Sequence, residues 1–179
     1  MNEGASGAPR ERYRLVIFDA DGTLRRTTVS GQPCPHADGE WELIEGVRER
    51  LAELPGAVLF AVASNQDHVG YGLVDERTAH RLLLRMIETA SGRSVAPSAV
   101  RYCPHRLEVD CSCRKPGAGM LRAILAHYAI APEAALFVGD AEVDRQAAAN
   151  AGVAFEWAHV FFRRAGAVSA QQSDSNNER

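Results

Sequence analysis

The sequence lacks an apolar run long enough to cross a bilayer, and it lacks an excess of positive charge. Its longest uninterrupted apolar stretch, residues 57–63, suits a buried strand, whereas a membrane helix needs about 20 apolar residues. The 20 basic and 23 acidic residues give a net charge of -3 with no basic stripe, so nucleic acid is not an expected partner. The first residues include an acid and no apolar core, unlike a secretory signal, and we expect a cytoplasmic protein with no membrane attachment.

The chain also lacks the composition of a disordered or coiled-coil protein. With 179 residues, 46% of them hydrophobic and 24% charged, it is large enough for one domain with its own core. Residues 1–12 and 166–179 are small or polar, and we expect both to be flexible tails. The sequence therefore predicts a single domain over residues 13–165, and we expect it to be a monomer.

Short apolar runs alternate with helical patterns along the chain, which is typical of an α/β protein with a parallel sheet. We expect strands at residues 15–18, 58–63, 100–102, 136–138 and 153–155. We expect helices at residues 47–54, 75–91, 117–128 and 142–151, the last ended by Gly152. Residues 24–41 show no clean period and hold two glycines and two prolines, which predicts a long loop or a small hairpin after the first strand.

Carboxylates follow two of the predicted strands. Asp19 and Asp21 come directly after the first, and Asp140 and Asp144 follow the fourth. Because the carboxyl ends of parallel strands meet at one edge of a sheet, these groups converge, and their like charges repel unless a cation lies among them. A hard divalent ion resolves that conflict, and we expect Mg²⁺.

A second group of ligand-type side chains lies within residues 103–113. Cys103, His105, Cys111 and Cys113 are the Cys₃His set that tetrahedral zinc prefers, in a segment too short for secondary structure of its own. Such a closed site leaves no position for water, so we expect structural Zn²⁺ in a zinc-binding loop. Free thiols without a metal are the alternative.

Four motifs in chain order resemble those of the haloacid dehalogenase (HAD) superfamily. They are D-x-D-G-T at residues 19–23, Ser64 at a strand end, Lys115-Pro116, and G-D-x-x-x-D at residues 139–144. The resemblance spans about residues 13–155 and implies a Rossmann-like, three-layer α/β fold around a parallel sheet, without a large cap domain. It also implies a phosphatase in which Asp19 is the nucleophile and Asp21 the general acid and base.

The same resemblance assigns the remaining site residues. Asp19, Asp140 and the backbone carbonyl of Asp21 are expected to hold Mg²⁺, with Asp144 orienting those ligands from behind. The residues expected to contact the phosphate or substrate are Thr23, Ser64, Asn65, Arg114 and Lys115.

A zinc loop followed by Arg-Lys-Pro resembles one branch of this family, the heptose-bisphosphate and histidinol-phosphate phosphatases. The gap of five residues between His105 and Cys111 resembles the histidinol type, whereas residues 70–74 resemble the heptose type. These relatives usually carry Arg where this chain has Ala20; Arg25 and Arg26 are candidate replacements, although loop arginines are more often only solvated.

We therefore expect a small phosphorylated sugar or polyol as substrate, with the heptose 1,7-bisphosphate type first and histidinol phosphate as the alternative. A nucleic-acid 3′-phosphatase and a non-catalytic, zinc-stabilised binding module are further alternatives. The acidic balance of the chain disfavours the former, and the retained carboxylates disfavour the latter.

Cys34-Pro35-His36 repeats the Cys-Pro-His of the zinc loop. Two ligands do not make a closed metal site, so the sequence favours loop residues without a metal role. Nothing in the sequence decides whether His68 faces the same cleft.

Overall fold

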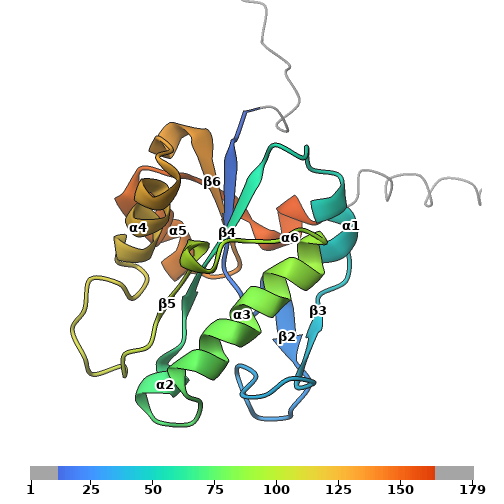
Figure 1. Cartoon of the computed structure of the whole chain (residues 1–179). Coiled ribbons are helices and arrows are strands. Elements are labelled where there is room, and N and C mark those ends of the chain that lie inside the picture. Colours follow the sequence, from blue (N-terminus) through green and yellow to red (C-terminus); the bar gives the residue numbers. More distant parts are fainter. Residues whose placement is uncertain (1–11, 164–179) are drawn as a thin grey trace, which may run out of the picture.

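The computed structural model describes residues 12–163, so the predicted tails lie outside the described residues apart from residue 12. Five parallel strands form one sheet in the order β5-β4-β1-β6-β7, with β1 in the centre (Figure 1). The strands are β1 (Leu15–Phe18), β4 (Leu59–Asn65), β5 (Val100–Cys103), β6 (Ala135–Gly139) and β7 (Ala154–Trp157). Every residue of β1 and β6 is buried, which explains their continuous apolar sequence.

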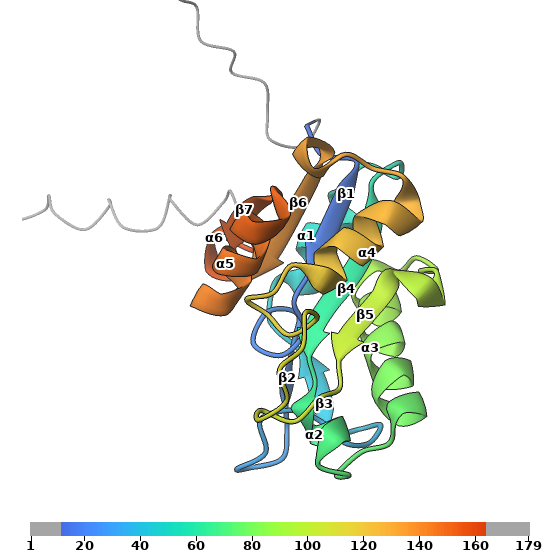
Figure 2. The same ribbon diagram turned by 90° about the vertical axis from the view of Figure 1, so that its left-hand side faces the viewer.

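Helices cover both faces of the sheet and make three layers, as the sequence predicts. One face carries α1 (Val47–Ala52), α3 (Glu76–Ser91) and α6 (Ala158–Phe161), and the other carries α4 (Gly119–Tyr128) and α5 (Glu142–Ala151) (Figures 1 and 2). Three further helices are a single turn long. They are the α-helix α2 (Asp67–Gly70) and the 3₁₀-helices η2 (Pro97–Ala99) and η3 (Pro132–Ala134).

The segment after β1 is a small antiparallel hairpin, the second of the two predicted possibilities. It pairs β2 (Arg25–Thr27) with β3 (Trp41–Leu43), and the connecting residues extend past the carboxyl ends of the main strands. This hairpin is all that the described chain, residues 12–163, inserts between β1 and α1. The described residues therefore hold no large cap domain.

Local sequence sets the helix ends. Asp75 accepts the backbone N–H of Thr78 and begins α3, and Gly92, at φ 66°, ends it. Gly152 ends α5 at φ 74°, as predicted. The helix α4 begins at Gly119, two residues later than predicted, because residues 117–118 are held in a turn against the preceding loop.

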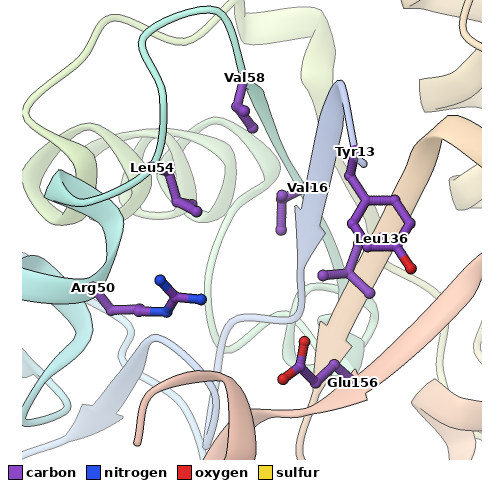
Figure 3. A pocket seen from close by; sticks show the side chains of 7 residues that line it. All are labelled: Tyr13, Val16, Arg50, Leu54, Val58, Leu136 and Glu156. Carbon is purple, nitrogen blue, oxygen red and sulfur yellow. The ribbon is translucent and has the colours of Figure 1, made fainter. Parts of the chain in front are cut away.

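A small cavity of about 30 Å³ lies near the amino-terminal ends of the strands (Figure 3). Val16 and Leu136 form its floor, and Arg50 and Glu156 lie at its sides. This space holds one or two water molecules at most and lies away from the strand ends that carry the predicted site. Among the described helices none is long and apolar enough to span a membrane.

Candidate active site

The predicted site residues converge at the carboxyl ends of β1, β4 and β6. The backbone N–H of Asp19 donates to the carbonyl of Val138 at 2.9 Å, which continues the β1–β6 ladder up to the first carboxylate. The chain then turns at Gly22, whose φ is 89°. A Cβ on Gly22 would lie 2.2 Å from Oδ2 of Asp140, so glycine is what allows the two motifs to approach each other.

Lys115 joins two of the carboxylates in the interior. Its Nζ lies 2.5 Å from Oδ1 of Asp19 and 2.7 Å from Oδ1 of Asp144, and it donates to the carbonyl of Ala63 at 3.0 Å. Only 4% of Lys115 is exposed, so water screens these charges weakly. The arrangement holds one ammonium between the carboxylate of the expected nucleophile, Asp19, and that of Asp144.

The pKa values of this group depart from their ordinary values in the way that the contacts require. The pKa of Asp19 is raised to about 7, chiefly by burial and in part by the charge of Asp144, whereas Lys115 acts in the opposite direction. Burial works to lower the pKa of Lys115, but Asp19 and Asp144 outweigh it and the net shift is upward. Without a metal, Asp19 therefore holds a proton up to nearly neutral pH, while Lys115 stays charged.

Asp140 supplies the exposed carboxylate of the cluster. Ligand oxygens of Asp19, Asp140 and Asp144 all lie within 4.8 Å of one another. Burial and the charge of Asp144 raise the pKa of Asp140, and the Thr23 hydroxyl, which donates to its Oδ1 at 3.2 Å, acts against them. These hard oxygen donors fit a magnesium ion, which would remove the repulsion that raises the carboxylate pKa values.

Asp144 is the least available of the three carboxylates for a metal. It is 1% exposed, contacts Lys115, and accepts the backbone N–H of Ala141 at 3.0 Å at the start of α5. Close packing against Gly139 fixes it further, because a Cβ on that glycine would lie 2.5 Å from the Asp144 Cβ. Its geometry suits an orienting role better than direct coordination.

Two contacts on Asp21 are absent from the sequence-based expectations. Arg25 Nε donates to its Oδ1 at 2.8 Å, and Gln66 Nε2 donates to its Oδ2 at 2.8 Å. Arg25 is 1% exposed, so the expectation of a solvated loop arginine is wrong for it; Arg26 is exposed and pairs with Glu42. Successive side chains of a strand point to opposite faces, so Arg25 and Arg26 cannot both face solvent. This alternation could have predicted that Arg25 is buried.

The predicted phosphate contacts divide into two groups. Ser64 is buried at the end of β4, and its hydroxyl accepts from Gln66 at 2.9 Å. The side chain of Asn65 instead clamps the backbone of Lys115: its Oδ1 accepts the Lys115 N–H at 3.0 Å and its Nδ2 donates to the Lys115 carbonyl at 3.2 Å. Asn65 thereby positions the lysine, a role that its place at a strand end did not reveal.

The zinc loop brings its four ligand atoms together. Sγ of Cys103 and Cys113 lie 3.4 and 3.3 Å from Nδ1 of His105, and both lie 3.6 Å from Sγ of Cys111. A tetrahedral zinc ion would require about 3.5 Å between sulfur and nitrogen and about 3.8 Å between two sulfurs. A disulfide needs about 2.05 Å between sulfurs, so the cluster fits a zinc ion and not a disulfide.

The zinc loop packs directly against the start of α4. Gly119 donates its N–H to the Ser112 carbonyl at 3.1 Å, and a Cβ on Gly119 would lie 2.6 Å from that oxygen. Arg114 turns its guanidinium onto the loop and donates to the carbonyl of His105, while its Nε is buried without a partner. A cavity of about 450 Å³ opens between residues 107–111 and Lys115.

Comparisons with known proteins agree with this site. A family model described as HAD-hydrolase-like matches residues 112–157. A D-glycero-beta-D-manno-heptose-1,7-bisphosphate 7-phosphatase of Pseudomonas putida is 34% identical over 140 residues, which are 78% of this chain and 78% of the relative. The histidine biosynthesis bifunctional protein HisB of Legionella pneumophila is 30% identical over 146 residues, 79% of this chain and 40% of that protein.

A solved structure supports the same assignment. The crystal structure of the D,D-heptose 1.7-bisphosphate phosphatase from B. bronchiseptica, complexed with magnesium and phosphate, superposes with a TM-score of 0.67 and 32% identity. The match covers 79% of this chain and 78% of that one. The chain therefore belongs to the HAD-like hydrolases. Within them it is a HAD-type phosphatase, a phosphoric monoester hydrolase.

Proposed function

We propose that this protein is a magnesium-dependent phosphomonoesterase that forms a phosphoaspartyl intermediate on Asp19. The observation that carries the proposal is the contact of Lys115 with Asp19 at 2.5 Å, beside Asp140 and Asp144 at one sheet edge. A binding module has no need to bury a lysine among carboxylates, because such a cluster costs desolvation energy.

Asp19, Asp140 and the backbone carbonyl of Asp21 would hold the magnesium ion. When bound, the ion supplies positive charge that offsets the carboxylates and the phosphoryl oxygens. Thr23 fixes one oxygen of Asp140 by its hydrogen bond, which leaves that carboxylate oriented toward the cluster.

Asp19 provides the nucleophile. A carboxylate oxygen of Asp19 forms a bond to phosphorus as the bond from phosphorus to the substrate oxygen breaks, and the leaving oxygen takes a proton from Asp21. In the second half, Asp21 removes a proton from water as that water attacks phosphorus and releases Asp19 and inorganic phosphate. Arg25 and Gln66 hold the Asp21 carboxylate at both oxygens in a fixed orientation for both transfers.

Lys115 and Ser64 lie beside Asp19, where they would contact the oxygens of a bound phosphoryl group. Lys115 provides a fixed positive charge next to the reacting carboxylate, and Asn65 holds its backbone in place. The cavity between residues 107–111 and Lys115 offers space for the remainder of a small substrate, with Arg114 at its wall. Arg114 is the residue that we expect to contact a second polar or anionic group there.

We further propose a small phosphorylated sugar as substrate, of the D-glycero-D-manno-heptose 1,7-bisphosphate class. The support is the similarity to relatives that carry this name, together with the open cavity beside the zinc loop. Histidinol phosphate is the second candidate, because the five-residue gap between His105 and Cys111 and the HisB relatives favour it.

The proposal also includes structural zinc at Cys103, His105, Cys111 and Cys113, with a single domain over residues 13–165 acting as a monomer. None of the four cysteines forms a disulfide, which fits the cytoplasmic location that we propose.

Phosphate release from a substrate panel tests this function. The panel holds heptose 1,7-bisphosphate, histidinol phosphate, other sugar phosphates and a 3′-phosphorylated oligonucleotide, each with and without magnesium. We expect magnesium-dependent release, highest with the heptose bisphosphate, and a loss of at least about a thousandfold in Asp19→Asn. Full activity of Asp19→Asn would remove the nucleophile assignment, and preference for histidinol phosphate would favour the second candidate.

A further inference from the structure

A second cluster of cysteine and histidine side chains, besides the zinc loop, lies at the same edge of the sheet. Cys34 and His36 come from the segment between β2 and β3, and His68 comes from α2. The three ligand atoms lie within 4.8 Å of one another, with the cysteine buried and both histidines half-buried. We propose that this cluster, the loop site, binds one zinc ion through these three side chains and leaves the fourth position open to water or to a substrate atom.

The donor chemistry favours zinc over magnesium. One thiolate and two imidazoles form a soft to borderline set, whereas magnesium takes oxygen ligands. Nε2 of His36 and Nδ1 of His68 lie 2.5 Å apart, closer than an ordinary hydrogen bond between nitrogens. On a tetrahedral zinc ion these nitrogens would be about 3.3 Å apart, so the rings need to separate by less than about 1 Å to accept one.

The protein holds the loop in the conformation that the site needs. Glu40 Oε2 accepts the backbone N–H of His36 at 2.8 Å and of Ala37 at 3.1 Å. Gln32 Nε2 donates to Glu40 at 3.0 Å and to the Cys34 carbonyl at 2.8 Å. These contacts fix the backbone on both sides of the ligands, so the loop does not have to be ordered when the ion binds.

The local sequence matches that of the zinc loop. Cys34-Pro35-His36 and Cys103-Pro104-His105 are the same tripeptide, and in the second copy the sulfur and nitrogen lie 3.4 Å apart. The sequence alone showed two ligands in the first copy. The fold supplies the third, His68, from a position that follows β4.

A metal at the loop site would join the hairpin to the catalytic edge. His68 is two residues beyond Gln66, whose amide donates to Asp21 at 2.8 Å. The Cys34 thiol also lies close enough to Asp21 and Arg25 to interact with their charges. The ion would therefore fix the segment between β2 and β3 beside the expected general acid and base, with its open position facing solvent or substrate.

Metal counting on the full chain tests the proposal. The protein is stripped with chelator, loaded with Zn²⁺ or Co²⁺ in buffer with a large excess of Mg²⁺, which keeps the carboxylate site filled, and freed of excess ion by gel filtration in the same Mg²⁺ buffer. We expect two ions per chain in the wild type, one in His68→Ala and two in His80→Ala. His80 is a half-buried histidine that pairs with the Pro97 carbonyl, lies near the Tyr102 ring and belongs to neither Cys/His cluster. Cys113→Ser, in the other cluster, is also expected to lose one ion.

The cobalt spectrum identifies which ligands are bound. In Cys113→Ser the ion that remains is expected at the loop site and should show the cobalt absorption of one thiolate ligand, Cys34. The separate variant Cys34→Ser is expected to lose the ion of the loop site, which leaves one ion per chain. One ion per chain in both wild type and His68→Ala would overturn the proposal. If His68→Ala does not fold, two ions per chain in Cys34→Ser would overturn it. The count is independent of turnover, so this result stands apart from the phosphatase assignment.

Discussion

At the scale of single residues, Asp19 carries a cost that the metal-free protein cannot avoid. Burial raises its pKa to about 7 in the folded state, against an ordinary value of 3.8. Well below pH 4 the folded and unfolded chains both hold this proton, so the titration of Asp19 gives stability no pH dependence there. Between pH 4 and pH 7 the unfolded chain loses the proton while the folded chain keeps it, so stability falls as pH rises.

Asp19→Asn removes this pH dependence. We expect the variant to gain stability relative to the wild type as pH rises from 4 to 7 and to hold a constant gain above that, in metal-free buffer. Urea unfolding at several pH values measures the difference. Asp38→Asn is the control, because Arg81 lowers the pKa of that exposed carboxyl, and its variant should gain nothing over this range. A difference between Asp19→Asn and wild type that does not change with pH would contradict the prediction.

Arg25 is a positioning residue for Asp21. Its guanidinium contacts both carboxylate oxygens, at 2.8 and 3.3 Å, in a fork that a lysine cannot reproduce. General acid and base catalysis typically contributes 10²–10⁴ in rate, so we expect Arg25→Lys to lower kcat by roughly 10- to 100-fold. The KM should change little, since Arg25 does not touch the cavity beside the zinc loop.

Arg26→Lys is the matched control for this experiment. It lies one position along the same strand, is exposed, and pairs with Glu42. Steady-state kinetics on both variants separates the two positions. Equal kcat values in Arg25→Lys and Arg26→Lys would remove Arg25 from the positioning role.

At the scale of elements, the loop of residues 103–113 packs against the start of α4 at Ser112 and Gly119, and Lys115 lies between these two residues in the chain. Gly119 allows the backbone of the helix to contact the Ser112 carbonyl, and that oxygen cannot move without the loop. We expect Gly119→Ala to lower the free energy of unfolding by about 1–3 kcal/mol, because backbone shifts of this kind carry that cost. Zinc affinity should fall as well.

Gly56→Ala provides the comparison, since a Cβ there meets nothing within 4 Å and the glycine is not among those at positive φ. Chemical denaturation and a competitive zinc chelator measure the two quantities. If Gly119→Ala unfolds at the same denaturant concentration as Gly56→Ala, the junction does not constrain the loop.

At the scale of the whole molecule, the sequence predicted the elements better than their contacts. Buried parallel strands need apolar residues on both faces, so β1 and β6 are visible as continuous apolar runs. The parallel arrangement then places Asp19 and Asp140 at one edge by geometry alone. The ligands of the zinc loop lie within eleven residues of one another, and the carboxylates occur in pairs that are close in sequence. This made both clusters recognisable.

Apart from the contact of Arg25 with Asp21, which lie four residues apart, the contacts that were missed join distant segments. Gln66 reaches Asp21 from another strand, and His68 reaches His36 across the hairpin. Asn65 is expected to contact phosphate, and the structure adds a contact that the sequence did not reveal, because its side-chain amide holds the Lys115 backbone. Side-chain direction at a strand end depends on the neighbouring loops, and no local pattern encodes it.

The central position of β1 also sets the order in which the site can be assembled during synthesis. The strand β1 is translated before both of its neighbours in the sheet. Leu15 pairs with Leu59 and with Ala135, so the β6 partner emerges from the ribosome 120 residues after Leu15. Contacts between such distant segments form late and slowly. The nascent chain therefore carries Asp19, the proposed nucleophile, long before Asp140 exists to complete the proposed site, and we expect catalytic competence only after β6 has been made.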